Sequence, residues 1–471
     1  MDNRNYKGNT IFIIVTRGFI VRNILRSGTL EALLRASARV VVIFDAAEVP
    51  AYLAKEFQHE QITLEACRIT LPRLHRFLLR FEKYFFRSAT TKLLISFRQG
   101  SKDRQKFREG HVPRKSSVAF LVERSLLFVL GGIPFLKRAF RFLENRLFPE
   151  RYESIQRLFD THKPDVLFST SIISSLDIAF MKEAKRRSIR TVSMPKTWDN
   201  MLNKYFSFVP DVLVVHNEVA KQAARTHQHI QSERIKTVGM PQFDWYRRPE
   251  ILRSRDAHWR GKGLDPSKAV IFFGSVGIWG ANDHAVAELI YSWIERGELG
   301  RPCQLFLRPH FSNVRDDVFK KLRGKLGVVI DEFRVVDTFS DNWDPTIEET
   351  IDFTNSVAHS DVMINFGSTL TLDAAAVDRP TVNPAFGCSF QGGEDVTYPY
   401  QYGADHYQWV LRENATLLSF TPEELKEQIQ DCLHHPEKKR AERKKLIAAL
   451  CYKVDGRSSE RLAETILDAS P

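Results

Sequence analysis

Short apolar runs alternate with helix-like segments along most of this chain, and this alternation limits the possible folds more than any other feature. Residues 11–15 (IFIIV) are predicted to form a buried strand, residues 20–36 a helix, and residues 38–44 (ARVVVIF) a second strand. A strand, a helix and another strand in this order form the unit from which parallel sheets are built. The pattern therefore predicts an α/β protein.

The alternation occurs in two blocks, separated by a polar stretch over residues 247–267 that we interpret as a link. Further strands are predicted at 165–169, 190–193, 211–216 and 235–238 in the first block, and at 269–273, 304–307, 328–330, 362–365 and 381–383 in the second. The 471 residues are enough for two domains of ordinary size. We expect domains over residues 1–250 and 265–440, followed by a C-terminal helix over residues 441–471.

Phe-rich and Arg-rich helical segments interrupt the first block over residues 70–150. From residue 73 onwards this insert holds 18 Lys and Arg against 6 Asp and Glu, an excess equal to the net charge of +12 of the whole chain. Leu74 and Phe77 are predicted on one helix face, and Arg73 and Arg76 on another. The insert could bind an anionic membrane surface, bind nucleic acid or be an ordinary solvated face. We favour a membrane surface or an anionic acceptor, and expect no nucleic acid partner.

The five cysteines are scattered without a CxxC pair, which favours a reducing compartment. The longest weakly charged stretch, residues 125–136, is too short to span a bilayer, and the N-terminal apolar run is too short for a signal peptide. We therefore expect a cytoplasmic protein, with peripheral attachment at the inner face of the plasma membrane as the alternative.

The strongest local motif follows the predicted strand over residues 362–365. Ser368 and Thr369 stand where the next helix should begin, so exposed amides and hydroxyls there could bind a phosphate. Asp373, one turn further, could accept hydrogen bonds from ribose hydroxyls. The alternative is that Ser368 or Thr369 only caps the helix.

Two other strand ends of the second block should face the same crevice. Gly274 and Ser275 follow its first strand, and Arg308 and His310 follow its second. Arg308 could neutralise a diphosphate leaving group, and His310 could hydrogen-bond a phosphate or a base. A structural hydrogen bond is the alternative role for His310.

In the first block, the loop with Trp198, Asp199 and Asn200 suits a sugar site, because a ring can stack on a sugar and a carboxylate can serve as a base. A simple turn with a packed Trp198 is the alternative. Arg17 follows the first strand and could face the cleft from the other side.

No HExxH, GxSxG, Walker A or clustered metal-ligand motif occurs. Asp337, Asp341 and Asp344 could touch a divalent ion, but we interpret their segment as a solvated acidic loop. We therefore predict neither a metal nor a cofactor.

Several motifs, taken in order, resemble the bacterial GT-B glycosyltransferase-like proteins of surface polysaccharide synthesis. The resemblance points to the CDP-glycerol glycerophosphotransferase and UDP-N-acetylglucosamine 2-epimerase branches, and it covers roughly residues 160–470 and the opening strand–helix–strand unit. The motifs are WDN at 198–200 with Lys204, VGMPQFD at 238–244, RPH at 308–310, residues 360–369 with Asp373 and Pro380, and DGRSSER at 455–461.

This resemblance implies two Rossmann-like domains whose parallel sheets face each other across a cleft, with the basic helical insert in the N-terminal domain. The C-terminal domain would hold the donor nucleotide and the N-terminal domain the acceptor, without a bound metal. The donor-site candidates are then Gly274, Ser275, Arg308, His310, Ser368, Thr369 and Asp373. Two departures stand out, since Asp373 replaces a more usual Glu, and the paired catalytic histidines of a glycerophosphotransferase have no match.

The expected function is transfer of a sugar from a nucleotide-activated donor to a surface-glycan or lipid-linked acceptor. Arg308, Ser368 and Thr369 would stabilise the departing diphosphate, His310 would assist there, and Asp199 would assist the acceptor hydroxyl. The alternatives are an epimerase, hydrolase or glycerophosphotransferase of the same fold, or a non-catalytic polysaccharide assembly protein.

Overall fold

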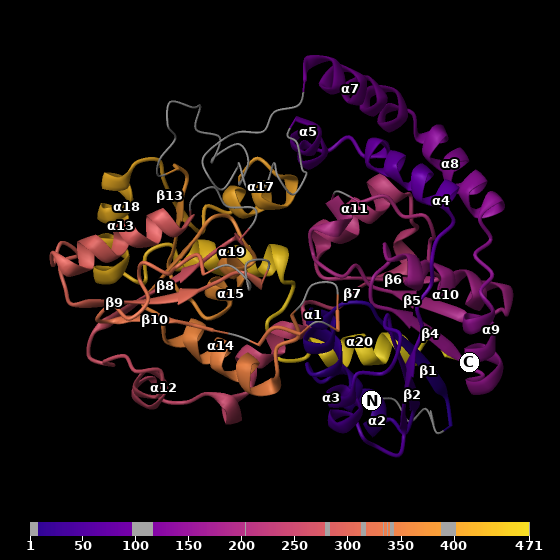
Figure 1. Ribbon diagram of the computed structural model, residues 1–471, viewed down its shortest axis with the longest axis horizontal. Coiled ribbons are helices and arrows are strands. Elements are labelled where there is room, and N and C mark those ends of the chain that lie inside the picture. The colour runs from indigo at the N-terminus through magenta and orange to yellow at the C-terminus, as the bar shows by residue number, and fades with distance from the viewer. Residues whose placement is uncertain are drawn as a thin grey trace.

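The computed structural model describes residues 8–96, 116–202, 204–277, 283–311, 317–332, 334–336, 338–339, 343–387 and 402–470. Figure 1 shows two lobes side by side, each built around one sheet. All strand pairs within both sheets are parallel. The predicted α/β class is confirmed.

The first lobe contains a seven-stranded sheet in the order β3-β2-β1-β4-β5-β6-β7. Its two inner strands over Thr10–Val15 and Val166–Ser169 are buried at every position, as expected for apolar runs covered by helices on both faces. The strands are β1 (Thr10–Val15), β2 (Arg39–Phe44), β3 (Ile62–Ala66), β4 (Val166–Ser169), β5 (Arg190–Ser193), β6 (Val212–Val215) and β7 (Ile235–Thr237).

The helix predicted over residues 20–36 is interrupted. A short α1 (Gly18–Ile20) continues as a π-helix over Val21–Leu25, and α2 (Thr29–Arg35) begins after a break. Gly28 stands in the break with a φ of 116°, a conformation that favours glycine. The other helices of this lobe are α3 (Ala51–Glu56), α9 (Glu153–His162), α10 (Ser175–Arg186) and α11 (Glu218–Gln228).

The second lobe contains a six-stranded sheet in the order β10-β9-β8-β11-β12-β13. Its strands are β8 (Ala269–Gly274), β9 (Cys303–Arg308), β10 (Val328–Ile330), β11 (Val362–Asn365), β12 (Thr381–Pro384) and β13 (Leu417–Ser419). Its helices are α12 (Arg255–Gly261), α13 (Asp283–Glu295), α14 (Ile347–His359), α15 (Leu370–Ala376), α17 (Asp405–Arg412), α18 (Pro422–His434) and α19 (Arg440–Leu450).

Two segments differ from a simple two-block chain. The stretch predicted as a polar link includes α12, which packs on α14 and buries Trp259 completely, so this part belongs to the second lobe. The last helix, α20 (Ser458–Leu467), returns to the first lobe and packs against α2 (Figure 1). Asp244, in the 3-10 helix Pro241–Arg247, accepts hydrogen bonds from the amides of Ser458 and Ser459 at 3.0 and 2.7 Å.

The insert between β3 and α9 is helical, as predicted. It comprises α4 (Arg73–Leu78), a 3-10 helix over Leu79–Phe85, α5 (Ala89–Ser96), α7 (Ser117–Gly132) and α8 (Pro134–Leu147). These helices follow the outer edge of the first lobe in Figure 1, and α5 lies near α17 of the second lobe. Asp405 of α17 accepts hydrogen bonds from the amides of Ala89 and Thr90 at 3.2 and 2.7 Å.

Candidate functional site

In each sheet the strand order reverses between two neighbouring strands, and this is the topological switch point. The two strands are β1 and β4 in the first lobe and β8 and β11 in the second. In open α/β sheets, ligands bind in the crevice beyond the carboxyl ends of the strands at such a point. A cavity of about 300 Å³, here called the interlobe cavity, lies there in the second lobe. Its walls include Gly274, Ser275, Arg308, His310, Ser368, Thr369 and Asp373, and Trp198 from the first lobe. All seven predicted donor-site residues are thus together.

Gly274 ends β8 and lies opposite both Arg308 and Asn365 in the neighbouring strands. A Cβ atom at this position would stand 2.3 Å from Leu370 Cδ2, so a larger residue would displace the Leu370 side chain at the start of α15. The hydroxyl of Ser275 donates to Asp283 Oδ2 at 2.6 Å and accepts from the amide of Gly277 at 3.0 Å. Ser275 therefore holds the loop in shape as well as lining the cavity.

In the turn after β11, Ser368 bonds to neighbouring residues of the same turn. The amide and hydroxyl of Ser368 lie 3.0 and 3.2 Å from Asn365 Oδ1, and the hydroxyl accepts from the amide of Leu370 at 3.3 Å. The helix that follows, α15, has only seven residues, and Thr369 makes no capping bond to it. Ser368 therefore bonds to the first turn of the helix, which was the alternative to phosphate binding. The more exposed Thr369 faces the cavity.

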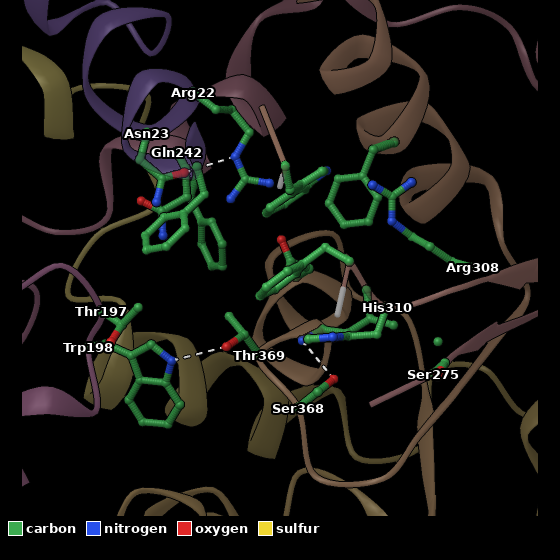
Figure 2. Close-up of a pocket in the computed structure, with 18 of the residues that line it drawn as sticks. Arg22, Asn23, Thr197, Trp198, Gln242, Ser275, Arg308, His310, Ser368 and Thr369 are labelled. Atoms are coloured by element: carbon green, nitrogen blue, oxygen red, sulfur yellow. Dashed lines mark hydrogen bonds between the residues drawn. The ribbon is translucent and has the colours of Figure 1, made fainter. Parts of the chain in front are cut away.

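Two arginines from different lobes line the cavity. Arg308 ends β9, pairs with Asp331 and lies over the ring of Phe353 at 4.4 Å. Arg22 comes from the π-helix of the first lobe and lies 5.0 Å from the centre of the Trp343 ring. In Figure 2 both guanidinium groups are on the same side of the cavity, above His310 and Ser368.

The charge states of three groups follow from their surroundings. Burial lowers the pKa of Arg22 to about 10, with Arg308 adding to this effect and Asp373 opposing it, so Arg22 is cationic at pH 7. Burial raises the pKa of Asp373 to about 6, although Tyr246 donates a hydrogen bond of 2.7 Å to its Oδ1. Burial lowers the pKa of His310 to about 4, so its imidazole is neutral at pH 7.

Trp198 is the predicted first-lobe residue that lines this cavity. It is only 6% exposed, its indole nitrogen donates to Thr369 Oγ1 at 3.3 Å, and its ring meets His406 edge-on at 5.3 Å. Both partners belong to the second lobe, so Trp198 joins the two halves across the site (Figure 2).

Asp199, Asn200 and Arg17, also predicted for the cleft, do not line the interlobe cavity. Asn200 is 3% exposed and begins a 3-10 turn that directs the chain into the first lobe. The charge of Asp199 acts on His216, whose pKa burial nevertheless lowers to about 4. Arg17 lines a second cavity in the first lobe.

The expectation of a solvated acidic loop is wrong for Asp344. This carboxylate is completely buried, pairs with Arg26 and accepts a 2.7 Å hydrogen bond from Tyr52, because the loop closes onto the first lobe. Asp337 and Asp341 lie outside the described residues. Within the described ranges, no group of three His, Cys, Asp or Glu is placed to hold a metal ion.

Sequence reasoning missed Arg22, Asn23, Gln242 and Trp343 as cavity residues. A signal existed for Arg22 and Asn23, because the predicted helix begins directly after β1 and its start must face the carboxyl edge of the sheet. Trp343 had no such signal, since it comes from a polar loop without a strand or helix pattern.

Solved structures share this architecture over nearly the whole chain. A UDP-N-acetylglucosamine 2-epimerase matches with a TM-score of 0.54 and 13% identity, over 98% of this chain and 95% of the other. S. aureus MnaA with UDP matches with a TM-score of 0.52 and 11% identity, over 97% and 96%. A variant of the wall teichoic acid polymerase TagF matches with a TM-score of 0.50 and 11% identity, over 98% and 88%.

These similarities confirm the predicted fold, two Rossmann-like lobes in the GT-B arrangement, and they agree with the resemblance seen in the sequence. No protein-family model matches the sequence, and no curated protein sequence matches it.

Proposed function

We propose that this chain is a glycosyltransferase that moves a sugar from a nucleotide-activated donor to a lipid-linked or surface-glycan acceptor. The observation that carries the donor half is the convergence of Arg22 and Arg308 on one cavity at a topological switch point. A nucleoside diphosphate carries charges that two fixed arginines can neutralise. The similar structures of UDP-N-acetylglucosamine 2-epimerases and of MnaA with UDP support a nucleotide ligand of this class.

In the reaction, an acceptor hydroxyl oxygen forms a bond to the anomeric carbon of the sugar. The bond from that carbon to the diphosphate oxygen breaks, the nucleoside diphosphate leaves with the electron pair, and the proton of the acceptor hydroxyl is released to water. Arg22 and Arg308 stabilise the charge that develops on the leaving group, because they are preorganised in a partly desolvated site. The neutral His310 can donate one hydrogen bond there, and Asp373 can accept from the ribose.

The donor site is tested by measuring the dissociation constants of UDP, GDP, CDP and CMP by calorimetry. Arg22→Gln and Arg308→Gln are each expected to weaken the best ligand by about tenfold to a hundredfold, the loss typical of a hydrogen bond to a charged group. Arg260→Gln is the matched control, because this side chain is 70% exposed on α12. Failure of all four nucleotides to bind, or equal effects of the control, would remove the proposal.

An epimerase or hydrolase acting on the donor alone is the second candidate, favoured by the epimerase structures of the same fold. Incubation with UDP-N-acetylglucosamine alone separates the candidates, because only an epimerase or hydrolase forms product without an acceptor. The surface of the helical insert favours transfer to a lipid-linked acceptor.

Helix α8 presents the inverse of an ordinary surface helix. Lys137, Arg141 and Asn145 point into the protein and donate hydrogen bonds of 2.7–2.9 Å to main-chain carbonyls of the first lobe. Phe135 and Phe142 are 72% and 68% exposed on the outside. Surface helices in water normally bury the apolar stripe, so this orientation favours an apolar surface, such as a membrane, on the outside.

Exposed apolar side chains also occur on α4 and α7, and these helices carry exposed basic residues as well. The exposed apolar side chains of the insert are Leu74, Phe77, Val118, Leu121, Val122, Phe128, Val129, Ile133, Phe135, Phe142, Leu143 and Leu147. The exposed arginines of the described part of the insert are Arg73, Arg76, Arg80, Arg87, Arg124, Arg138 and Arg146. Exposed apolar side chains and exposed arginines on the same helices fit the interface of an anionic membrane.

In this proposal the helices of the insert lie along the membrane surface. No single helix in the described ranges is long and apolar enough to cross a bilayer. Helix α7 and residues Phe135–Leu147 meet that criterion only together, and they are bent by 92°. The insert is therefore proposed to rest in the headgroup region and to keep the cleft close to a membrane-borne acceptor.

Co-sedimentation with vesicles tests the membrane contact. The double variant Phe128→Ser/Phe135→Ser is expected to lose most binding to vesicles that contain phosphatidylglycerol. Leu326→Ser is the control, because Leu326 is 91% exposed but lies in the second lobe. If the double variant instead changes the oligomeric state and binds vesicles normally, the surface contacts a second copy of the chain and the membrane proposal fails.

A further inference from the structure

A hollow of about 560 Å³, here called the α8 groove, lies on the flank of α8 and shares no residue with the interlobe cavity. Its walls are Arg138, Arg141, Phe142, Asn145, Arg146 and Pro149. Because successive residues of a helix are about 100° apart, the helical members of this set occupy one continuous face of α8. The groove therefore adjoins, on one side, the part of α8 that packs on the first lobe and, on the other, its exposed apolar side chains.

The walls of the α8 groove carry positive charge without a matching negative charge. Three of the six wall residues are arginines, and none of the six is an aspartate or a glutamate. Arg138 and Arg146 are exposed, and within the described ranges neither makes an ion pair or a side-chain hydrogen bond. Unpaired guanidinium groups in a hollow are suited to an anion, and their planar donors match a phosphate in particular.

Hydrogen bonds to the first lobe fix the inner end of the groove. Arg141 donates from Nε to the carbonyl of Phe206 at 2.7 Å and from Nη2 to Gln228 Oε1 at 3.2 Å. Asn145 donates from Nδ2 to the carbonyls of Arg141 and Ser207 at 2.8 and 2.9 Å. This part of the wall is therefore in place before a ligand arrives, which reduces the entropy that binding would cost.

The basic groups around the groove disfavour one another's charged forms. Burial lowers the pKa of Lys137 to about 8, and the charge of Arg141 adds to this effect. Burial also lowers the pKa of His229, and the charge of Arg138 and those of the two cations just named act in the same direction. An anion bound in the groove would reduce this repulsion, which gives an energetic reason for a ligand there.

The apolar side chains next to the groove indicate what carries the anion. Phe142 lines the groove and is itself exposed, and Phe135 and Leu147 are exposed near the two ends of the same helix. A nucleic acid, an acidic peptide or a free phosphate would cover the arginines and leave these side chains in water. A phospholipid offers a phosphate at the level of the headgroups and acyl chains directly beneath it, so it covers both.

We infer that the α8 groove binds the phosphate of an anionic phospholipid, with Arg138 and Arg146 in contact with the phosphate and Phe142 against the start of the acyl chains. The insert then holds one lipid headgroup in a defined position, in addition to the general attraction between basic helices and a negative surface. The inference rests on the proposed membrane contact of the insert and names the lipid group that this contact recognises.

The first experiment compares two double variants of equal charge in co-sedimentation with vesicles of phosphatidylcholine and phosphatidylglycerol. Arg138→Gln/Arg146→Gln removes two arginines of the groove, and Arg76→Gln/Arg80→Gln removes two exposed arginines of the insert outside it. The second pair is expected to weaken binding by about tenfold, through loss of general attraction alone. The groove pair should weaken it by about a hundredfold, because it also loses hydrogen bonds between charged groups. Equal thermal unfolding temperatures show that both variants are folded.

The outcomes separate this inference from the proposals on which it depends. Equal losses in the two double variants would overturn the inference and leave the general membrane contact in place. If the unsubstituted chain does not bind these vesicles, the membrane contact itself fails and the inference fails with it. The affinity for UDP, measured without vesicles, tests the donor site independently of either result.

The second experiment identifies the source of the phosphate by calorimetry with three soluble probes. These are dihexanoylphosphatidylglycerol below its critical micelle concentration, glycerol 3-phosphate and polyuridylate. The short-chain lipid is expected to bind at least about tenfold more tightly than glycerol 3-phosphate, because its chains bury apolar surface, and to lose this binding in Arg138→Gln/Arg146→Gln. Equal, arginine-dependent binding of glycerol 3-phosphate would identify a free phosphate, and tighter binding of polyuridylate would identify a nucleic acid. Either result would overturn the lipid assignment.

Discussion

The indole nitrogen of Trp198 donates a hydrogen bond of 3.3 Å to the hydroxyl of Thr369, and these two residues belong to different lobes. This bond lies in the wall of the interlobe cavity. The Trp198 ring is buried in a cluster that contains Phe243, Tyr246 and core residues of the second lobe. The arrangement of the lobes and the shape of the site are therefore linked through one side chain.

Trp198 should consequently affect ligand binding through packing more than through its hydrogen bond. Trp198→Phe removes the donor but keeps much of the buried ring, and is expected to weaken UDP by no more than about tenfold, since a net hydrogen bond contributes about 1 kcal/mol. Trp198→Ala removes the buried ring and should lower the free energy of unfolding by about 3–5 kcal/mol. Calorimetry and urea unfolding measure the two effects, and equal losses in both variants would contradict this view.

Donor binding should depend on pH through Asp373. Burial raises the pKa of this carboxyl to about 6, and the ionised form accepts stronger hydrogen bonds from ribose hydroxyls than the protonated form does. The affinity for UDP-N-acetylglucosamine should then be constant above pH 7 and fall as the pH drops below 6. A nucleotide-sugar is the proper ligand for this test, because it lacks the phosphate monoester that itself titrates at about pH 6.

Asp373→Asn is the control for the pH effect. The amide cannot titrate, so the variant should bind more weakly at pH 7.5 and show no further loss between pH 7 and pH 5. A pH profile that remains unchanged in Asp373→Asn would assign the titration to another group.

The contact of Gly274 with Leu370 predicts a specific double-variant result. Gly274→Ala places a methyl group 2.3 Å from Leu370 Cδ2, and such overpacking typically costs about 1–3 kcal/mol. Combining it with Leu370→Ala makes room, so the double variant should be more stable than the sum of the single effects indicates. Gly261→Ala is the control, because no atom lies within 4 Å of the added Cβ. Urea unfolding of the four variants would refute the contact if the effects were additive.

The sequence predicted most strands of both sheets because many of their apolar runs are buried on both faces, as for β11. The bounds predicted for β5, β10 and β11 agree with the structure residue by residue. It missed β3, in which Thr63 and Glu65 interrupt the apolar pattern, and β13, which is only three residues long. The edge strand β10 is also only partly buried, but all three of its residues are apolar. It missed the break at Gly28 because periodicity cannot detect a left-handed residue between two helical turns.

The donor side of the site was predictable because strand ends of one parallel sheet must meet at one edge. Gly274, Arg308 and Ser368 needed only the strand assignments to be placed together. The first-lobe side was not predictable in the same way, because the approach of the lobes depends on packing between distant residues. Asp199 was a reasonable candidate by type, but the turn at Asn200 takes that part of the loop away from the cavity.

Attachment of the insert to the first lobe should weaken at alkaline pH because of His75. His75 is buried against Phe148, with its ring nitrogens 3.2 Å from Glu144 and 3.1 Å from Glu150. Burial alone would lower its pKa, but the two carboxylates outweigh this effect and raise the pKa to about 9. Burial also raises the pKa of Glu82, to about 8, and the charge of Glu144 adds to it.

Both groups hold their protons more tightly in the folded protein than in the unfolded chain, where the histidine titrates at 6.5 and the glutamate at 4.5. The stabilisation from His75 is therefore complete below pH 6.5 and is lost as the pH rises through 9, and Glu82 acts in the same direction up to pH 8. Amide hydrogen exchange in α4 and α8, corrected for the intrinsic rate, should accelerate between pH 6.5 and 9, whereas exchange in β8 should not. His75→Gln, which cannot titrate, should make this pH dependence shallower, and an unchanged slope would show that the histidine does not hold the insert in place.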